Sequence, residues 1–180
     1  MEQNDKLEAA LGVFLHYGYK KTSMDDLAGA FGISRQGLYK NYSSKQEIFE
    51  KVFTYHVERS LQGVKSALHA PNGTLHGKLE RAFHFAAGQY INRLRSSPHS
   101  YEILHIVSDR DDKEHHHNLY QEMFKNFLKT NKVSPANGTL DDVVATMMAA
   151  LDGLVHMAAS EKEFDKGARH IIAALVPEKE

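Results

Sequence analysis

The spacing of hydrophobic positions along the chain predicts a protein built from helices. Apolar residues recur at intervals of three and four, and no stretch combines strand-like alternation with β-branched enrichment. Four prolines fall where these helical patterns stop, at Pro71, Pro98, Pro135 and Pro177. We therefore expect an all-α fold of about nine helices.

Capping residues mark several of the predicted helices. The first carries its apolar face from Leu7 to Leu15 and ends at Gly18, and Thr74 and Thr139 each open a later helix. The predicted helices cover residues 7–15, 24–31, 35–39, 45–68, 74–94, 101–107, 114–128, 139–160 and 164–175. The helix over 45–68 would be about 36 Å long, enough to link two subdomains.

Composition narrows the class of protein. The chain has 180 residues, of which 42% are hydrophobic and 25% charged, as in ordinary globular proteins. A chain of this length can form a hydrophobic core without disulfides or a structural metal. It contains no cysteine, which excludes disulfides, thiolate metal sites and thiol nucleophiles. No apolar run reaches the length of about 18 to 20 residues that spans a bilayer, and the first residues do not resemble a signal peptide. We expect a cytoplasmic protein.

Residues 18–49 carry the most informative pattern. We expect Thr22 to cap a short helix with Asp25 in its first turn, Gly32 to allow a sharp turn, and Ser34 to cap a second short helix. Ile33, between the two, should pack with Leu27, Leu38, Phe14 and Phe49 in a small shared core. This order of signals predicts a helix-turn-helix.

The charge of this segment favours a nucleic-acid partner. The net charge of the whole chain is −1, yet residues 20–45 hold five basic residues against two acidic ones. At the start of the second helix, Arg35 and Gln36 would face base edges in a major groove, and Gly37 would let the backbone approach. Tyr39, Lys40, Tyr42 and Lys45 suit phosphate contacts, and Ser44 with Glu47 predicts a capping box that opens the next helix.

The same segment resembles the amino-terminal signature of the tetracycline-repressor-like (TetR) family. The matching residues are Gly18, Tyr19, Thr22, Leu27, Ala28, Gly32, Ile33, Ser34, Leu38, Tyr39, Tyr42, Ser44, Lys45, Glu47 and Phe49. Tyr42 stands where Phe is commoner and Phe31 where Ala is, and Arg35-Gln36-Gly37 occupies variable positions. These departures bear on which DNA sequence is read.

The resemblance implies a domain plan and a function. It implies a helix-turn-helix DNA-binding domain at residues 1–46 and a helical regulatory domain at 47–180 that binds a ligand and forms a homodimer through its last two helices. The candidate DNA-binding residues are Thr22, Ser34, Arg35, Gln36, Gly37, Tyr39, Lys40, Tyr42 and Lys45. The expected function is repression from a near-palindromic operator, relieved by a small, largely apolar effector.

Effector contacts are predicted from residues that combine apolar surface with polar tips. These candidate ligand-binding residues are Phe83, Tyr90, Tyr101, His105, Met123, Phe127, Met147 and His156. The spacing of Ala149 and Gly153 would let a partner helix approach closely, as a dimer interface requires.

Two alternatives from other classes remain at this stage. Twelve histidines, several one helical turn from a carboxylate, as in Glu80 with His84 or Glu102 with His105, raise the idea of a metal-dependent helical-bundle oxidoreductase. Adjacent histidines such as His115 and His116 diverge by about 100° on a helix, so they do not converge on one ion. The other alternative is a helical protein-binding adaptor. We expect no metal, no cofactor and no enzymatic activity.

Overall fold

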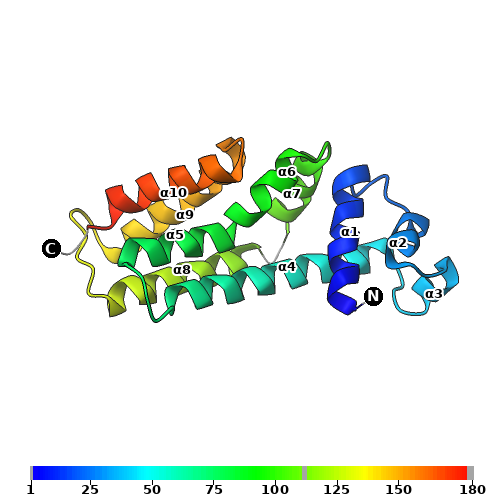
Figure 1. Cartoon of the computed structure of the whole chain (residues 1–180), viewed down its shortest axis with the longest axis horizontal. Coiled ribbons are helices and arrows are strands. Elements are labelled where there is room, and N and C mark those ends of the chain that lie inside the picture. Colours follow the sequence, from blue (N-terminus) through cyan, green and yellow to red (C-terminus); the bar gives the residue numbers. More distant parts are fainter. Residues whose placement is uncertain (1, 111–112, 178–180) are drawn as a thin grey trace. The chain divides into compact units, whose positions relative to one another are not determined.

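The computed structural model describes residues 2–110 and 113–177, and this part of the chain is helical and contains no strand (Figure 1). The helices are α1 (Gln3–Tyr17), α2 (Met24–Phe31), α3 (Arg35–Tyr39), α4 (Lys45–Leu68), α5 (Leu75–Ala86), the 3-10 helix η1 (Gly88–Tyr90), α6 (Ile91–Arg95), α7 (Ser100–Ser108), α8 (Lys113–Thr130), α9 (Leu140–Met157) and α10 (Glu161–Leu175). The all-α prediction is confirmed, and within these residues ten α-helices replace the expected nine.

The additional helix arises from a break that the apolar pattern does not reveal. That pattern predicts one helix over residues 74–94, but Ala87 leaves the helical conformation with φ −149°. The Ser60 hydroxyl donates to the Phe85 carbonyl at 2.7 Å and lies 3.2 Å from the Ala86 carbonyl. The Gln89 side chain also donates to the Phe85 carbonyl. Side chains therefore supply the hydrogen bonds that the interrupted helix loses.

The chain forms two compact units, and the first consists of Met1–Arg59 with Leu94–Asp111. It contains α1, α2, α3, the start of α4, and α7. Phe14, Leu27, Leu38 and Phe49 are buried in one cluster, with the Phe14 and Phe49 rings 5.1 Å apart edge to face. Ile33 packs against this cluster. The predicted shared core of the helix-turn-helix is thus confirmed.

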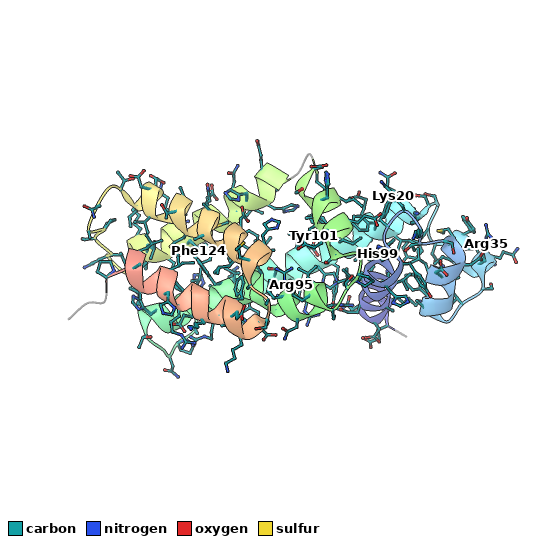
Figure 2. The ribbon with its side chains drawn as sticks, turned by 90° about the horizontal axis from the view of Figure 1, so that it is seen from above. Lys20, Arg35, Arg95, His99, Tyr101 and Phe124 are labelled. Carbon is teal, nitrogen blue, oxygen red and sulfur yellow. The ribbon has the colours of Figure 1, made fainter. Side chains whose placement is uncertain are left out.

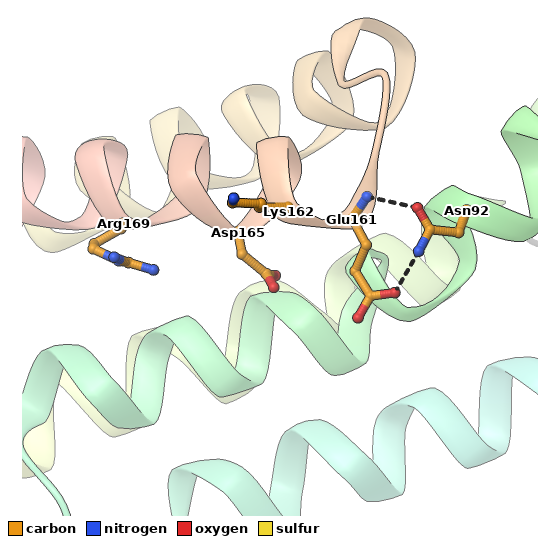
Figure 3. A pocket seen from close by; sticks show the side chains of 5 residues that line it. All are labelled: Asn92, Glu161, Lys162, Asp165 and Arg169. Atoms are coloured by element: carbon orange, nitrogen blue, oxygen red, sulfur yellow. Dashed lines mark hydrogen bonds between the residues drawn. The ribbon is translucent and has the colours of Figure 1, made fainter.

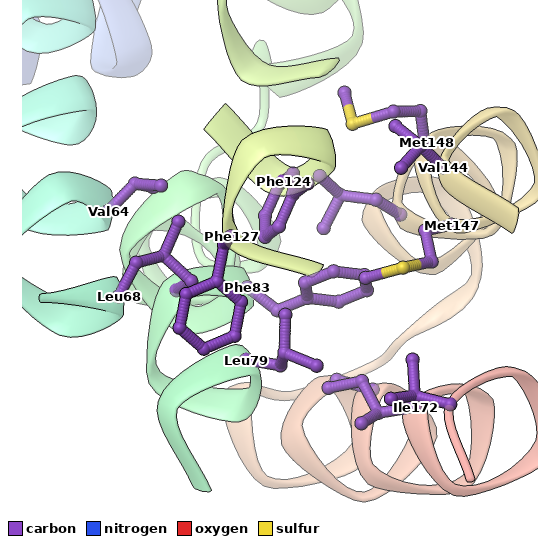
Figure 4. Packing of buried hydrophobic residues seen from close by; sticks show 14 of the residues in the cluster. Val64, Leu68, Leu79, Phe83, Phe124, Phe127, Val144, Met147, Met148 and Ile172 are labelled. Atoms are coloured by element: carbon purple, nitrogen blue, oxygen red, sulfur yellow. The ribbon is translucent and has the colours of Figure 1, made fainter. Parts of the chain in front are cut away.

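The second unit consists of Ser60–Arg93 with Asp112–Glu180. Its helices α5, α8, α9 and α10 lie side by side (Figure 1). Phe83, Phe124, Met147 and Ile172 are fully buried in their common core, where the Phe83 and Phe124 rings stand 5.5 Å apart (Figure 4). None of the helices in the described part of the chain has the length and apolarity to cross a bilayer.

Helix ends in the second unit follow local capping. Thr139 opens α9, as the sequence predicts: its hydroxyl accepts from the Asp142 amide, and the Asp142 carboxylate accepts from the Thr139 amide. Thr74 likewise caps α5. The expected helix over 139–160 is shorter, because it ends at Met157 and Ser160 becomes the cap of α10.

Candidate nucleic-acid interface

The first unit presents α2 and α3 as a helix-turn-helix. Gly32 adopts the left-handed conformation, with φ 66°, and ends α2. The Ser34 hydroxyl then accepts from the Gly37 amide at 3.1 Å and opens α3. Leu38 is fully buried and anchors this five-residue helix. Local capping and one apolar anchor therefore position α3.

The cap of α2 differs from the prediction by one residue. Ser23, not Thr22, accepts from the Asp26 amide, and the Asp26 carboxylate accepts from the Ser23 amide and hydroxyl. These hydrogen bonds lower the pKa of Asp26, and the bond from the Ser23 hydroxyl has the largest effect. Thr22 is only 3% exposed, and its hydroxyl donates to the Gly18 carbonyl at 2.7 Å. The expectation that Thr22 caps this helix was wrong, because its side chain points into the domain.

The outward face of α3 carries the polar residues that the sequence singled out. Ser34, Arg35, Gln36, Tyr39 and Lys40 are all exposed, and Gly37 is half-buried beside the Ser34 hydroxyl. Figure 2 shows Arg35 projecting from the outer side of its helix. Five of the nine predicted DNA-contact residues therefore share one accessible surface, which we call the α3 face.

Arg35 has a partner that sequence reasoning did not identify. Its Nη1 atom lies 2.9 Å from Asp25 Oδ2, and both side chains are 60% exposed. The guanidinium also lies 5.7 Å from the centre of the Tyr39 ring. Water screens such an exposed pair, so it contributes little to stability and can open when a stronger acceptor arrives.

Lys45 and Tyr42 have their polar groups engaged within the domain. Lys45 Nζ donates to the carbonyls of Tyr19 (2.6 Å), Lys20 (3.1 Å) and Thr22 (2.9 Å), and lies 4.7 Å from the Tyr19 ring centre. Tyr42 is 6% exposed and accepts a hydrogen bond from the Gln3 side chain. Lys45 thus ties the start of α4 to the segment between α1 and α2.

Helix α7 contacts the same segment between α1 and α2. Gly18 has φ 77° and ψ 155°, a conformation that glycine alone adopts readily, and a Cβ there would clash with the Glu102 carboxylate. That carboxylate accepts from the Lys20 amide at 2.9 Å and faces His99 at 3.8 Å. The residues that precede α2 are therefore held by both α4 and α7.

The start of α4 shows a shifted version of the predicted capping box. Ser44 accepts from the Glu47 amide, as expected, but the Glu47 carboxylate accepts from the amide and hydroxyl of Ser43. These hydrogen bonds lower the pKa of Glu47, and the bond from the Ser43 amide has the largest effect. The arrangement still fixes the entry into α4.

The structure distributes the predicted effector contacts over several environments. Phe83, Phe127 and Met147 belong to the buried core of the second unit, Met123 packs against that core, and Tyr90 is half-buried. Tyr101 and His105 are exposed residues of the first unit, and His156 is exposed on α9. The described core therefore unites four of the eight candidates.

Histidine pairing also differs from the spacing on the helices. Glu80 contacts Arg169 at 3.6 Å, and His105 contacts Asp109 at 2.8 Å. His84 instead lies beside two carboxylates of α10. His105 and Asp109 are one turn apart at the end of α7, whereas helix packing gives Glu80 and His84 partners on α10.

Comparison with known proteins places the helix-turn-helix in a family. Residues 7–52 match the model of the bacterial regulatory proteins, tetR family. The chain is 31% identical over 102 residues to an uncharacterized HTH-type transcriptional regulator, YezE, of Bacillus subtilis, a match that covers 57% of this chain and 50% of the relative. It is 40% identical over 62 residues to the HTH-type transcriptional activator FasR of Mycolicibacterium smegmatis, covering 34% of this chain and 28% of the relative. The matched segments thus span half or less of these relatives.

Solved structures share the fold over almost the whole chain. The reduced form of NemR from E. coli has a TM-score of 0.74 at 12% identity, covering 98% of this chain and 97% of NemR. PfmR from Thermus thermophilus, a TetR family transcriptional regulator, has a TM-score of 0.68 at 17% identity, covering 97% of this chain and 99% of PfmR. Residues 7–52 therefore match the tetR family of bacterial regulatory proteins, and the chain as a whole shares the fold of these solved structures.

Proposed function

We propose that the protein is a DNA-binding transcriptional regulator whose α3 face enters the major groove of an operator. The exposed polar face of α3, anchored from behind by Leu38, is the observation that carries this proposal. Arg35 and Gln36 lie at the amino-terminal end of α3, where recognition helices contact base edges. The match of residues 7–52 to the tetR family supports the same assignment.

The residues of the helix-turn-helix divide into two roles in this proposal. Arg35 and Gln36 read bases, and Ser34, Tyr39 and Lys40 contact the phosphate backbone. Thr22, Tyr42 and Lys45 act indirectly, because their polar groups hold the segments on either side of α2 and α3. Arg35 exchanges Asp25 for a base edge on binding.

We propose a homodimer formed through α9 and α10. Ala145, Ala149 and Gly153 are exposed at four-residue intervals on one face of α9, and Met157, next in the series, is 82% exposed. A Cβ placed on Gly153 would meet nothing within 4 Å. Small residues that end in an exposed methionine suit close contact with a second copy, and such a dimer would read a near-palindromic operator.

The regulatory proposal follows the family. We expect repression, because a dimer seated on a promoter would block the polymerase, and we expect a small, largely apolar effector bound in the second unit to relieve it. The half-buried Met123 packs against the buried Phe83 and Phe127 there. The relative FasR is named an activator, so transcription from a promoter carrying the selected operator, with and without protein, tests the direction.

Selection of duplexes from a random pool at moderate salt tests DNA binding. We expect an inverted repeat to be enriched. Arg35→Ala should reduce preference for one base pair in each half-site by about 5- to 150-fold, since one bidentate pair contributes about 1 to 3 kcal/mol of discrimination. Lys40→Ala should weaken all sequences alike and reduce the salt slope by about 1.

Lys129→Ala, an exposed lysine of α8, serves as the matched control and should change neither quantity. Failure to enrich any inverted repeat would contradict the proposal and favour a protein-binding adaptor. An equal loss of affinity for Arg35→Ala on every duplex would contradict its assignment as a base reader.

Sedimentation velocity tests the dimer. Ala149→Arg places a charged side chain in the proposed interface and should give monomers that bind the operator weakly. Asn126 is an exposed residue of α8, so the control variant Asn126→Arg should form a dimer as the wild type does. A dimer that persists with Ala149→Arg would exclude the α9 face as its interface.

A further inference from the structure

A histidine and two carboxylates of the second unit converge where α10 begins. His84 comes from α5, and Glu161 and Asp165 lie one turn apart on α10, so they share a face of that helix. His84 Nδ1 is 3.3 Å from Asp165 Oδ1 and 3.9 Å from Glu161 Oε1. One potential ligand atom from each residue lies within 4.8 Å of the others.

Neighbouring groups hold these ligand atoms in place. Asn92 donates to Glu161 Oε2 at 3.1 Å and accepts from the Glu161 amide at 2.9 Å (Figure 3). This double contact fixes the carboxylate so that its other oxygen, Oε1, is the one near His84. Gly88 leaves room beside the imidazole, because a Cβ there would lie 3.2 Å from His84 Nδ1.

The charge of the cluster is unbalanced. With a neutral imidazole, the two carboxylates carry two negative charges, and within residues 2–110 and 113–177 neither forms an ion pair with lysine or arginine. Arg169, on the same helix, faces Glu80 instead. A divalent cation bound among the three ligand atoms would neutralise this charge.

We propose that His84, Glu161 and Asp165 bind a first-row transition-metal dication of the zinc class. Zinc bonds of about 2.0 to 2.1 Å at tetrahedral angles separate ligand atoms by about 3.3 Å. The separation of His84 Nδ1 and Asp165 Oδ1 matches this value, and Glu161 Oε1, 3.9 Å from His84 Nδ1, would move closer on binding. Imidazole nitrogen with carboxylate oxygen suits such ions. This site is independent of the proposed DNA-binding function.

The surroundings leave room for a fourth ligand. A cavity of about 380 Å³ adjoins the cluster and is lined by Asn92, Glu161, Lys162, Asp165 and Arg169 (Figure 3). A tetrahedral site with three protein ligands keeps one position for water or a small anion. The metal would join α5 to the first two turns of α10.

Calorimetric titration of the full-length, chelator-treated protein with zinc chloride tests the site. We expect His84→Ala and Asp165→Asn each to lower zinc affinity more than 100-fold, because each removes a ligand. Asn92→Ala removes only the group that orients Glu161, and should lower affinity by about 10- to 100-fold. His170→Ala, an exposed histidine of α10 bonded to the Lys166 carbonyl, is the matched control and should bind zinc as the wild type does.

Thermal unfolding supplies a second measurement that does not depend on DNA. Zinc should raise the unfolding midpoint of the wild type and of His170→Ala, but not those of His84→Ala and Asp165→Asn, because only a bound ligand stabilises the folded state. The metal-free midpoints show whether each variant folds. Equal zinc affinity in His84→Ala, Asp165→Asn and the wild type would assign binding to other histidines and overturn the proposal, as would a wild type that binds no zinc.

Discussion

Replacement of Lys45 by methionine tests the role that the structure gives this residue. Lys45 Nζ donates to three backbone carbonyls between α1 and α2, at 2.6, 3.1 and 2.9 Å. Methionine keeps the unbranched apolar stem of the side chain but removes the charged nitrogen with all three donors. The carbonyls of Tyr19 and Thr22, whose bonds to Lys45 are partly buried, would then depend on water.

The expected loss follows from these contacts. A hydrogen bond from a charged group contributes about 1.5 to 3 kcal/mol, but neighbouring bonds to one ammonium are not additive. Water can replace part of the interaction at this half-exposed site, so we expect Lys45→Met to reduce the free energy of unfolding by about 2 kcal/mol. For a chain of this size, that corresponds to a midpoint about 4 to 8 °C lower.

Thermal unfolding followed by circular dichroism measures this loss, with Lys51→Met as the control on the same helix. Lys51 Nζ lies 3.9 Å from Glu47 with its side chain 50% exposed, and such a screened surface pair should contribute little to stability. At a temperature where Lys45→Met is folded, its operator affinity should keep the wild-type salt slope. Unchanged stability with a slope reduced by about 1 would show that Lys45 contacts a phosphate and refute our reasoning.

Three further predictions concern stability. Gly18→Ala should cost about 1 to 3 kcal/mol in urea unfolding, because alanine is strained at φ 77° and its Cβ meets the Glu102 carboxylate; a cost near zero would show that this segment relaxes freely. Phe124→Ala should cost about 3 to 5 kcal/mol, since the ring is fully buried against Phe83, and a loss below about 1 kcal/mol would contradict the tight packing of this core. Hydrogen bonds from the Thr139 amide and hydroxyl lower the pKa of Asp142 in the folded protein. The ionised Asp142 therefore stabilises the fold at pH values above its ordinary pKa of 3.8, and this stabilisation is lost as the pH falls through the lower pKa of the folded state. Asp142→Asn should therefore flatten the acid-side decline of stability in urea titrations, and an unchanged decline would rule out this contribution.

Local signals in the sequence were sufficient for the helix-turn-helix. The predicted helices over 24–31, 35–39 and 45–68 coincide with α2, α3 and α4. Gly32 and Ser34 act as the sequence predicts, because a left-handed turn and a hydroxyl cap depend on atoms only a few residues apart. Even the misassigned cap of α2 moved by only one residue, from Thr22 to Ser23.

Contacts between distant segments were beyond this reasoning. Periodicity cannot show that Ser60 of α4 bonds to the carbonyls freed where α5 ends, and so it predicts one helix in place of α5, η1 and α6. The placement of His84 beside α10 likewise required knowledge of which helices pack together.

The sequence by itself determined the helical class, the helix-turn-helix and the residues on the outer face of α3, because periodicity, caps and turns act over one or two helical turns. Only the tertiary structure decided which groups outside their own helical turn the charged side chains contact. The position of Lys45 in the motif predicts a phosphate contact, but its ammonium donates to the carbonyl of Tyr19, which lies much earlier in the chain. Arg35 forms an ion pair with Asp25 of the preceding helix. Such pairs depend on how the helices pack and on how far each charge is removed from water, and a local sequence pattern reveals neither.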